Sequence, residues 1–256
     1  NYPYNKPVRI AVKGVKMYNF FVNETEKQGN CFIITESDFN HISNVLRMKT
    51  GDEILVNCNG QASLCKIEIF SDYVRAEVIE ENYHNTNLPI KIHLFQGLPK
   101  SDKMELIIQK CVELGVCRIV PVLTSRCVSR PDSKSFEKKL TRYKKIAEEA
   151  AKQSGRGIIP EISGILSFDK AISDAKELDS AIVCYENGCE PVNSKTVLGK
   201  KSIGVFVGAE GGFSEDEIKI LEENGILAVW LGQRILRCET APMAITSILL
   251  HESGDM

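Results

Sequence analysis

The first part of the chain consists of short segments in which apolar and polar positions alternate or apolar residues run together. Between residues 17 and 83 these segments are NFFV, CFII, DEILVN, SLCKIEIF and YVRAEVI, which are typical of β-strands. Asn59 and Gly60 form an NG pair, a strong signal for a hairpin turn. One helix is expected from Ser37 to Arg47, where apolar residues recur at helical spacing. The pattern predicts a small β-barrel-like domain at residues 17–83, followed by a polar linker at 84–89.

From residue 90 to 256 the pattern becomes an alternation of apolar strands with amphipathic helices. IKIHLFQG, CRIVPVLT, SAIVCYE, SIGVFVG and LAVWLG are apolar runs of strand length. SDKMELIIQKCVELG predicts a helix with Ser101 as its N-cap and Gly115 as its stop. FEKKLTRYKKIAEEAAKQSG predicts a longer helix with one apolar stripe. This alternation predicts the α/β class, with a mostly parallel sheet covered by helices.

The segment GVFVGAEGGFSEDEIKILEENG, residues 204–225, predicts a buried strand, a glycine-rich turn and a helix. Ser214 and Glu217 fit a capping box at the start of that helix. The glycines permit close approach of the backbone to a ligand, at the sheet edge where α/β proteins bind ligands. The turn lacks the spacing of a P-loop or of a dinucleotide fingerprint, and Glu210 would repel a pyrophosphate. A tight turn without a ligand is the alternative at this point.

A second polar loop, LGQRILRCETAP, occupies residues 231–242 between another strand and an almost wholly apolar helix. Thr240 is expected to cap this helix, and Pro242 is tolerated in its first turn. Arg234 and Arg237 are either solvated, paired with Glu239, or part of a binding site. The apolar residues between the two arginines favour a loop that folds back into the protein, where buried arginines need partners. The two loops therefore predict one site at one edge of the sheet.

Composition narrows the function classes. The 256 residues carry a net charge of −2, so a nucleic-acid role requires a local basic patch. The nine cysteines are scattered without a C-x-x-C pair and the four histidines are dispersed, which favours reduced thiols and no metal site. No apolar run approaches the roughly 20 residues of a membrane span. Residues 1–16 are interpreted as a leader added for expression, since the patterned sequence begins at Met17; a genuine extension is the alternative.

Several segments together resemble a known family. GAEGGFSEDE and LGQRILRCETA resemble the paired signature motifs of the RsmE-type 16S rRNA uracil-N3 methyltransferases, of the SPOUT superfamily. HISNVLRMKTGDEI, LPKSDKMELIIQKCVELGV and EEAAKQSGR resemble its other blocks, in the right order. The chain departs from the family pattern in two places. Ala209 stands where the family usually has proline, and Asn19 stands where it usually has arginine, which puts one phosphate contact in doubt.

The resemblance implies a fold, a cofactor and partners. The fold is an N-terminal PUA-like RNA-binding barrel and a C-terminal SPOUT domain with a deep trefoil knot. The cofactor is S-adenosylmethionine, and the partners are 16S rRNA, within the small ribosomal subunit, and a second copy of the chain in a cytoplasmic homodimer. Together with the two loops, it implies a cofactor site made of Tyr185, Glu186, Gly208, Glu210, Gly211, Gly212, Leu231, Gly232, Ile235, Leu236, Arg237, Thr240 and Ala241. The catalytic candidates are Arg156, Arg237 and Glu210, with the base unassigned.

A local excess of positive charge points independently to RNA. From Arg126 to Arg156 there are ten Lys or Arg and four Asp or Glu, a balance of +6, although the whole chain is −2. A solvated helix face is the alternative. The expected RNA-binding residues are Arg126, Arg130, Gln153, Arg156 and Arg234. The resemblance implies transfer of a methyl group to N3 of a uridine, and the charge agrees with an RNA substrate. The alternatives are a non-catalytic RNA-binding assembly factor that retains the pocket, and another nucleotide-dependent enzyme.

Overall fold

The computed structural model describes residues 17–83, 88, 90–188 and 190–256. The chain divides into two compact units between residues 85 and 86, and each is described by itself. The expected leader at residues 1–16 and most of the expected linker lie outside the described residues. Among the described residues, no helix is both long enough and apolar enough to cross a membrane.

The N-terminal unit is built on a sheet whose described strands follow the order β1-β4-β5-β6-β3-β2. Its strands are β1 (Asn19–Phe21), β2 (Lys27–Gln28), β3 (Cys31–Ile34), β4 (Glu53–Cys58), β5 (Gln61–Ile69) and β6 (Val74–Glu80). The NG hairpin is confirmed: Asn59 and Gly60 connect β4 to β5 with φ of +50° and +80°, as a type I′ turn requires. One face of the sheet buries Phe20, Phe32, Ile54, Val56, Ile67 and Val74.

One prediction for this unit needs correction. The helix expected from Ser37 to Arg47 is a short α1 (Glu36–Asn40) that continues as a wider π-type turn over His41–Val45. Of its apolar residues, Ile42 is buried while Val45 is exposed, so the apolar face is narrower than the spacing suggests. Asn19 is buried and its side chain accepts a hydrogen bond from the Asn57 amide. It therefore lies inside the unit, and the phosphate contact that the family pattern would place at this position stays in doubt.

The C-terminal unit is α/β, as predicted, and every strand pairing given for its sheet is parallel. The strand order is β10-β8-β7-β13-β11-β14-β12, with β9 also paired to β8. The strands are β7 (Lys91–Gly97), β8 (Arg118–Leu123), β9 (Glu161–Ile162), β10 (Leu166–Ser167), β11 (Ser180–Cys184), β12 (Glu190–Pro191), β13 (Ser202–Val207) and β14 (Leu227–Trp230). Because they are parallel, all of them end at one edge, which we call the carboxyl edge.

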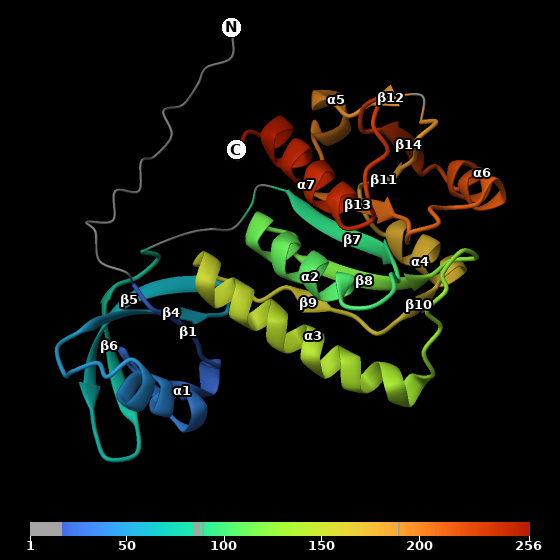
Figure 1. Ribbon diagram of the computed structural model, residues 1–256. Helices are drawn as coiled ribbons and strands as arrows, with labels where there is room; N and C mark the ends of the chain where they lie inside the picture. Colours follow the sequence, from blue (N-terminus) through green and yellow to red (C-terminus); the bar gives the residue numbers. More distant parts are fainter. Residues whose placement is uncertain (1–16, 84–87, 89, 189) are drawn as a thin grey trace, which may run out of the picture. The chain divides into compact units, whose positions relative to one another are not determined.

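Helices cover both faces of this sheet (Figure 1). On one face α2 packs against both α3 and α7, and on the other α4 and α6 bury the apolar cluster around Phe95, Phe206 and Leu221. Their bounds are α2 (Lys103–Leu114), α3 (Ser133–Ser154), α4 (Phe168–Ala175), α5 (Ser194–Val197), α6 (Glu215–Glu223) and α7 (Thr240–Ser253). Helices therefore bury both faces of the sheet, which explains why the strand sequences are continuous apolar runs.

The helix ends agree only in part with the sequence patterns. Gly115 ends α2 in the left-handed region, with φ +111°, as predicted. Ser101 is not the N-cap of α2; that position belongs to Asp102, and Ser101 has φ +53°. Thr240 is likewise the first residue of α7 and Glu239 is its N-cap. In both cases the helix boundary lies one residue from the expected position, which sequence signals locate only to within a few residues.

The strand order places several connections at the carboxyl edge. The connection after β7 leads to β8 on one side, whereas the connection after β13, its neighbour, leads to β14 on the other side. Neighbouring strands whose connections leave in opposite directions create a crevice in which open α/β sheets bind ligands. The trefoil knot that the resemblance implies stays a prediction.

Candidate functional site

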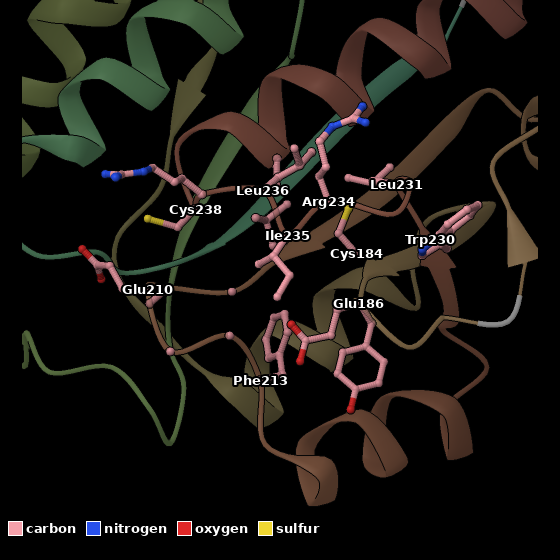
Figure 2. A pocket seen from close by; sticks show the side chains of 18 of the residues that line it. Cys184, Glu186, Glu210, Phe213, Trp230, Leu231, Arg234, Ile235, Leu236 and Cys238 are labelled. Atoms are coloured by element: carbon pink, nitrogen blue, oxygen red, sulfur yellow. The ribbon is translucent and has the colours of Figure 1, made fainter.

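A cavity of about 500 Å³ lies at the carboxyl edge, where β11, β13 and β14 end. Figure 2 shows the side chains of Phe213 and Ile235 facing each other across it, with Glu186 beside Phe213. Arg234 points away from this pair in the same view. The three connections that follow these strands contribute most of the lining, which is Lys103, Arg126, Cys184, Tyr185, Glu186, Val207, Gly208, Ala209, Glu210, Gly211, Gly212, Phe213, Trp230, Leu231, Gly232, Gln233, Arg234, Ile235, Leu236, Arg237, Cys238 and Ala241.

Glycines let the backbone after β13 fold tightly against its surroundings. A Cβ on Gly208 would lie 2.7 Å from Cα of Gly212, and a Cβ on Gly97 would lie 2.6 Å from the backbone nitrogen of Ala209. Such contacts are with backbone, which cannot move aside as the end of a side chain can. Gly212 closes the turn by donating its N–H to the Ala209 carbonyl at 3.0 Å. Glycine at position 208 is therefore required by the packing of the loop itself, whether or not a ligand is bound.

Glu217 holds this loop against the loop that follows β8. The expected capping box is confirmed: Ser214 Oγ accepts from the Glu217 N–H, and the Glu217 carboxylate accepts from the Ser214 N–H at 2.9 Å. The same carboxylate accepts from the N–H of Ser125 at 2.6 Å and from its hydroxyl at 2.9 Å. Glu217 is buried, so its carboxylate depends on these bonds in place of water. One side chain thus fixes the spacing of two loops.

Lys103, at the start of α2, links the two polar loops of the cavity. Its Nζ lies 3.3 Å from Oε1 of Glu210, in the loop after β13, and 3.4 Å from Oε2 of Glu239, in the loop after β14. The N–H of Lys100 also donates to Glu210 Oε1 at 3.1 Å. The Cys238 thiol donates to Glu239 Oε2 at 3.1 Å. The ammonium therefore neutralises two carboxylates that would otherwise repel each other at the cavity wall.

The pKa shifts in this cluster follow from these contacts. Partial burial acts to raise the pKa of Glu210, but the backbone N–H groups and the Lys103 ammonium outweigh it and hold that pKa below its ordinary value of 4.5. The bond from the Cys238 thiol helps lower the pKa of Glu239. Burial and the nearby carboxylates raise the pKa of Cys238 to about 12. At neutral pH both carboxylates are ionised and the thiol is protonated, so Glu210 is a weak proton acceptor and Cys238 is not a nucleophile.

The residues predicted for the cofactor converge on this cavity. All of them line it except Thr240, which is exposed on the first turn of α7. Other lining residues were not predicted from the sequence, among them Lys103, Cys184, Phe213 and Trp230. Cys184 and Trp230 are the last residues of their strands, and Phe213 directly follows the glycine pair. Their positions at or just after strand ends could have marked them as lining residues. No sequence signal pairs Lys103 with Glu210 and Glu239.

The residues predicted for RNA are distributed more widely. Arg126 and Arg234 line the cavity, and Arg126 donates to the Gly211 carbonyl at 2.9 Å. Arg130 is on the same loop, where it donates to the carbonyls of Thr124 and Ser125. Gln153 is exposed near the far end of α3 and does not line this cavity. No group of three or more potential metal ligands lies together among the described residues.

The contacts of Arg156 place it away from the cavity of its own chain. Its guanidinium donates to the carbonyls of Val112, Gly115 and Val116, at 3.1, 3.1 and 2.6 Å. These carbonyls terminate α2 and precede β8, so Arg156 lies at the edge of the sheet opposite the cavity. Within its own chain Arg156 caps the end of a helix and does not face the cavity, and its catalytic role stays a prediction. The EEAAKQSGR block marked Arg156 as a candidate site residue, but it did not indicate at which edge of the sheet the residue lies.

Replacing Arg156 with alanine is therefore expected to lower stability. The change removes charge-assisted donors from three carbonyls at a half-buried helix end, and the free energy of unfolding should fall by about 1–3 kcal/mol. Urea denaturation measures this. Arg130→Ala removes an exposed arginine that donates to two loop carbonyls. It is the control, and its free energy of unfolding should fall by less than half as much. Equal losses in the two variants would contradict the capping role.

Comparison with known proteins connects the cavity to a family. The family description "RNA methyltransferase domain" matches residues 86–250, which contain every residue that lines the cavity, and "RNA methyltransferase PUA domain" matches residues 34–72. Ribosomal RNA small subunit methyltransferase E from Bacillus subtilis is 36% identical over 250 residues, covering 93% of this chain and 97% of that protein. This chain belongs to the ribosomal RNA small subunit methyltransferase E family. The Aquifex aeolicus member is 34% identical over 230 residues, covering 88% of this chain and 96% of its own length.

Solved structures give the same assignment. A crystal structure of ribosomal RNA small subunit methyltransferase E from Neisseria gonorrhoeae, bound to S-adenosyl methionine, superposes with a TM-score of 0.79 at 30% identity and covers 92% of this chain and 98% of that one. A crystal structure of a protein described as hypothetical superposes with a TM-score of 0.85 at 35% identity. The match covers 92% of this chain and 98% of that one. This family member therefore shares the two-unit architecture of its relatives over nearly its whole length.

Proposed function

We propose that this chain transfers a methyl group from S-adenosylmethionine to N3 of a uridine in 16S rRNA. The observation that carries the proposal is the intact cavity at the carboxyl edge, built from the loops that the family motifs occupy. Family membership supplies the reaction class, because the relatives are named as ribosomal RNA small subunit methyltransferases and one of them was crystallised with S-adenosyl methionine. We also propose that the chain acts in the cytoplasm, where its rRNA substrate would be met.

The residues present fit S-adenosylmethionine. The cavity of about 500 Å³ suits a ligand of nucleoside size, and its wall around Gly208, Gly211 and Gly212 offers backbone without side chains. Ionised Glu210 and the exposed Glu186 suit a ligand that bears positive charge. No glycine loop followed by lysine and a hydroxyl is present for a triphosphate. When bound, the cofactor supplies an electrophilic methyl group on a sulfonium centre.

The chain's own residues would then orient the target base and stabilise its anion. Uracil N3 carries a proton and becomes a good nucleophile only as that proton leaves, so positive charge near the base lowers the barrier. Arg126, Arg234 and Arg237 line the cavity and supply that charge. Glu210 is better suited to anchor the loop and the cofactor than to accept the proton, because its pKa is held low by its hydrogen bonds and by Lys103.

Methylation of small ribosomal subunits from a strain that lacks this activity tests the proposal. The wild-type protein should incorporate one labelled methyl group, and mapping should place it on N3 of a uridine. Calorimetry should show binding of S-adenosylmethionine but not of NAD or ATP. Cofactor binding without methylation would instead favour the non-catalytic assembly factor. Binding of NAD or ATP in place of S-adenosylmethionine would favour another nucleotide-dependent enzyme.

We further propose that the chain forms a homodimer. Met243, Ala244, Ser247 and Ile248 form a half-buried, mostly apolar row on α7, beyond the residues that this helix buries against its own sheet. An apolar row that one chain does not fully cover favours association with a second copy. Light scattering at micromolar concentration should give twice the mass of the 28.5 kDa chain. A Met243→Glu, Ile248→Glu variant should be monomeric, and a monomeric wild type would contradict the proposal.

Replacing Lys103 with methionine is expected to weaken cofactor binding about tenfold, which corresponds to about 1.4 kcal/mol. Methionine keeps most of the unbranched side chain but leaves Glu210 and Glu239 facing each other without the ammonium. Lys100→Met is the matched control, because its backbone N–H still donates to Glu210. Calorimetry with S-adenosylmethionine measures both variants, and equal affinities would show that the cluster is not needed for the cavity.

The same cluster predicts a pH dependence. The pKa of Glu210 and that of Glu239 are lowered, so their contribution to stability is complete above about pH 4.5 and is lost as the pH falls through their folded values. In Lys103→Met these pKa values should rise toward 4.5, so acidification should lower the stability of the variant less than that of the wild type. Thermal denaturation between pH 3 and pH 7 measures the shift. If the melting temperatures of wild type and variant fell in the same way with decreasing pH, the prediction would be contradicted.

A further inference from the structure

Positive charge is concentrated in one part of the region that the sequence marks as basic. Between Arg126 and Lys145 there are eight Lys or Arg and two Asp or Glu, a balance of +6, whereas residues 146–156 hold two of each. The whole excess therefore belongs to the loop after β8 and to the first half of α3. The second half of the same helix is neutral, so the charge is a local feature and not a property of the helix as a whole.

Three of these lysines form a stripe on the outer face of α3. Lys134, Lys138 and Lys145 are exposed, and at 100° per residue they fall within about 40° of one another around the helix. Phe136 and Tyr143 lie on the opposite side and are buried. Eleven residues at about 1.5 Å each make the stripe about 16 Å long. We call Lys134, Lys138 and Lys145 the α3 lysine stripe.

The lysines of the stripe differ from other basic residues of α3 in their ion pairs. Arg142 pairs with Glu105 at 2.6 Å, and Lys152, in the neutral half, pairs with Glu148 at 2.9 Å. Within the described ranges, Lys134 and Lys138 form no salt bridge, and Lys145 approaches Glu149 only at 4.0 Å. Like charges spaced four residues apart on a helix repel each other. A polyanion would neutralise them together, which is the electrostatic basis of phosphate-backbone recognition.

The fold places the charged end of α3 beside the cavity. The chain runs along β8 to the carboxyl edge, returns through α3, and then enters β9, which is parallel to β8. Helix α3 therefore begins at the carboxyl edge and runs away from it, as Figure 1 shows. The loop between β8 and α3 carries Arg126, which lines the cavity and donates to Gly211. Positive charge thus continues from the cavity wall onto the helix.

We propose that the α3 lysine stripe binds the sugar–phosphate backbone of the rRNA strand next to the target uridine. This inference rests on the proposed function, because the strand must enter the cavity beside Arg126. Lysine ammonium groups on a helix face act as point charges and carry no base preference. The stripe therefore positions the strand and contributes affinity, while the choice of base belongs to the cavity.

Binding of a triple variant to RNA tests the stripe. Lys134, Lys138 and Lys145 are changed together to glutamine, and the control changes three exposed lysines at the opposite edge of the sheet, Lys91, Lys176 and Lys201, to glutamine. Filter binding uses deproteinised small-subunit rRNA from cells that lack the methyltransferase. The stripe variant should bind at least tenfold more weakly at about 0.1 M salt, and its salt slope should fall by about 2, from 0.7 for each of three phosphates. The RNA affinity of the control should stay within twofold of that of the wild type.

Two further measurements separate this inference from the proposed function. The stripe variant should keep wild-type affinity for S-adenosylmethionine and its turnover at saturating rRNA, with a raised KM for rRNA. RNA affinity within twofold of wild type, or an equal loss in the control, would overturn the stripe. A loss seen only with intact subunits would assign the face to a ribosomal protein and would also overturn it. A wild-type protein that binds rRNA through the stripe but transfers no methyl group would refute the proposed function alone.

Discussion

A Gly208→Ala variant is expected to lose cofactor binding and methyl transfer almost completely. The added methyl group would lie 2.7 Å from Cα and 2.8 Å from the carbonyl carbon of Gly212, and both are backbone atoms of the same turn. The turn must open to relieve this contact, and it forms one wall of the cavity. We expect the Kd for S-adenosylmethionine to rise by at least 100-fold, which corresponds to about 2.8 kcal/mol. Isothermal titration calorimetry measures the change directly.

Gly164→Ala provides the control for this variant. No atom lies within 4 Å of a Cβ added at Gly164, which is exposed and remote in sequence from both loops. The control should bind the cofactor as the wild type does and should unfold at nearly the same urea concentration. Circular dichroism establishes that Gly208→Ala is folded. A folded Gly208→Ala protein with wild-type affinity would show that the tight turn is not needed to form the cofactor site.

A Glu217→Gln variant is expected to lower the free energy of unfolding of the C-terminal unit by about 3 kcal/mol. The carboxylate accepts from two groups of Ser125 and from the Ser214 N–H, and it is 6% exposed. An amide at this position offers one oxygen in place of two, and its NH₂ group would face a donor. The variant would also replace charge-assisted hydrogen bonds with weaker neutral ones around a buried side chain. Urea denaturation with and without S-adenosylmethionine measures the loss.

Glu215→Gln is the matched change on the same helix. Glu215 is exposed in the first turn of α6, where its charge favours the helix only weakly. We expect Glu215→Gln to lower the free energy of unfolding by less than about 1 kcal/mol. If Glu217→Gln were no less stable than Glu215→Gln, the carboxylate would not be holding the loops after β8 and β13 together.

The local signals in the sequence predicted the elements of the C-terminal unit and most of the cavity. The Ser214–Glu217 capping box, the Gly115 helix stop and the NG hairpin each depend on a few adjacent residues, and all three are confirmed. The two polar loops were placed at one edge because parallel strands end together, and they do line one cavity. These inferences depend on short-range chemistry and on the periodicity of apolar residues.

The partners of charged residues could not be predicted in the same way. Lys103 meets Glu210 and Glu239 only because the sheet brings the start of α2 beside the ends of β13 and β14. Arg156 follows a basic helix and has glycine on both sides, yet the direction of α3 carries it to the edge away from the cavity. The path of the chain decides both cases, and strand order is not encoded in any local pattern.

The cavity can form only when nearly all of the chain has been made. The contacts that close it join residues far apart in sequence: 92 positions separate Ser125 from Glu217, 110 separate Lys100 from Glu210, and 135 separate Lys103 from Cys238. Contacts of such long range form late in folding, and the last loop leaves the ribosome after every strand of the sheet. A nascent chain should therefore be unable to bind S-adenosylmethionine until its final helix emerges. The finished protein should gain about 2.7 kcal/mol of stability when the cofactor is present at 100 times its Kd.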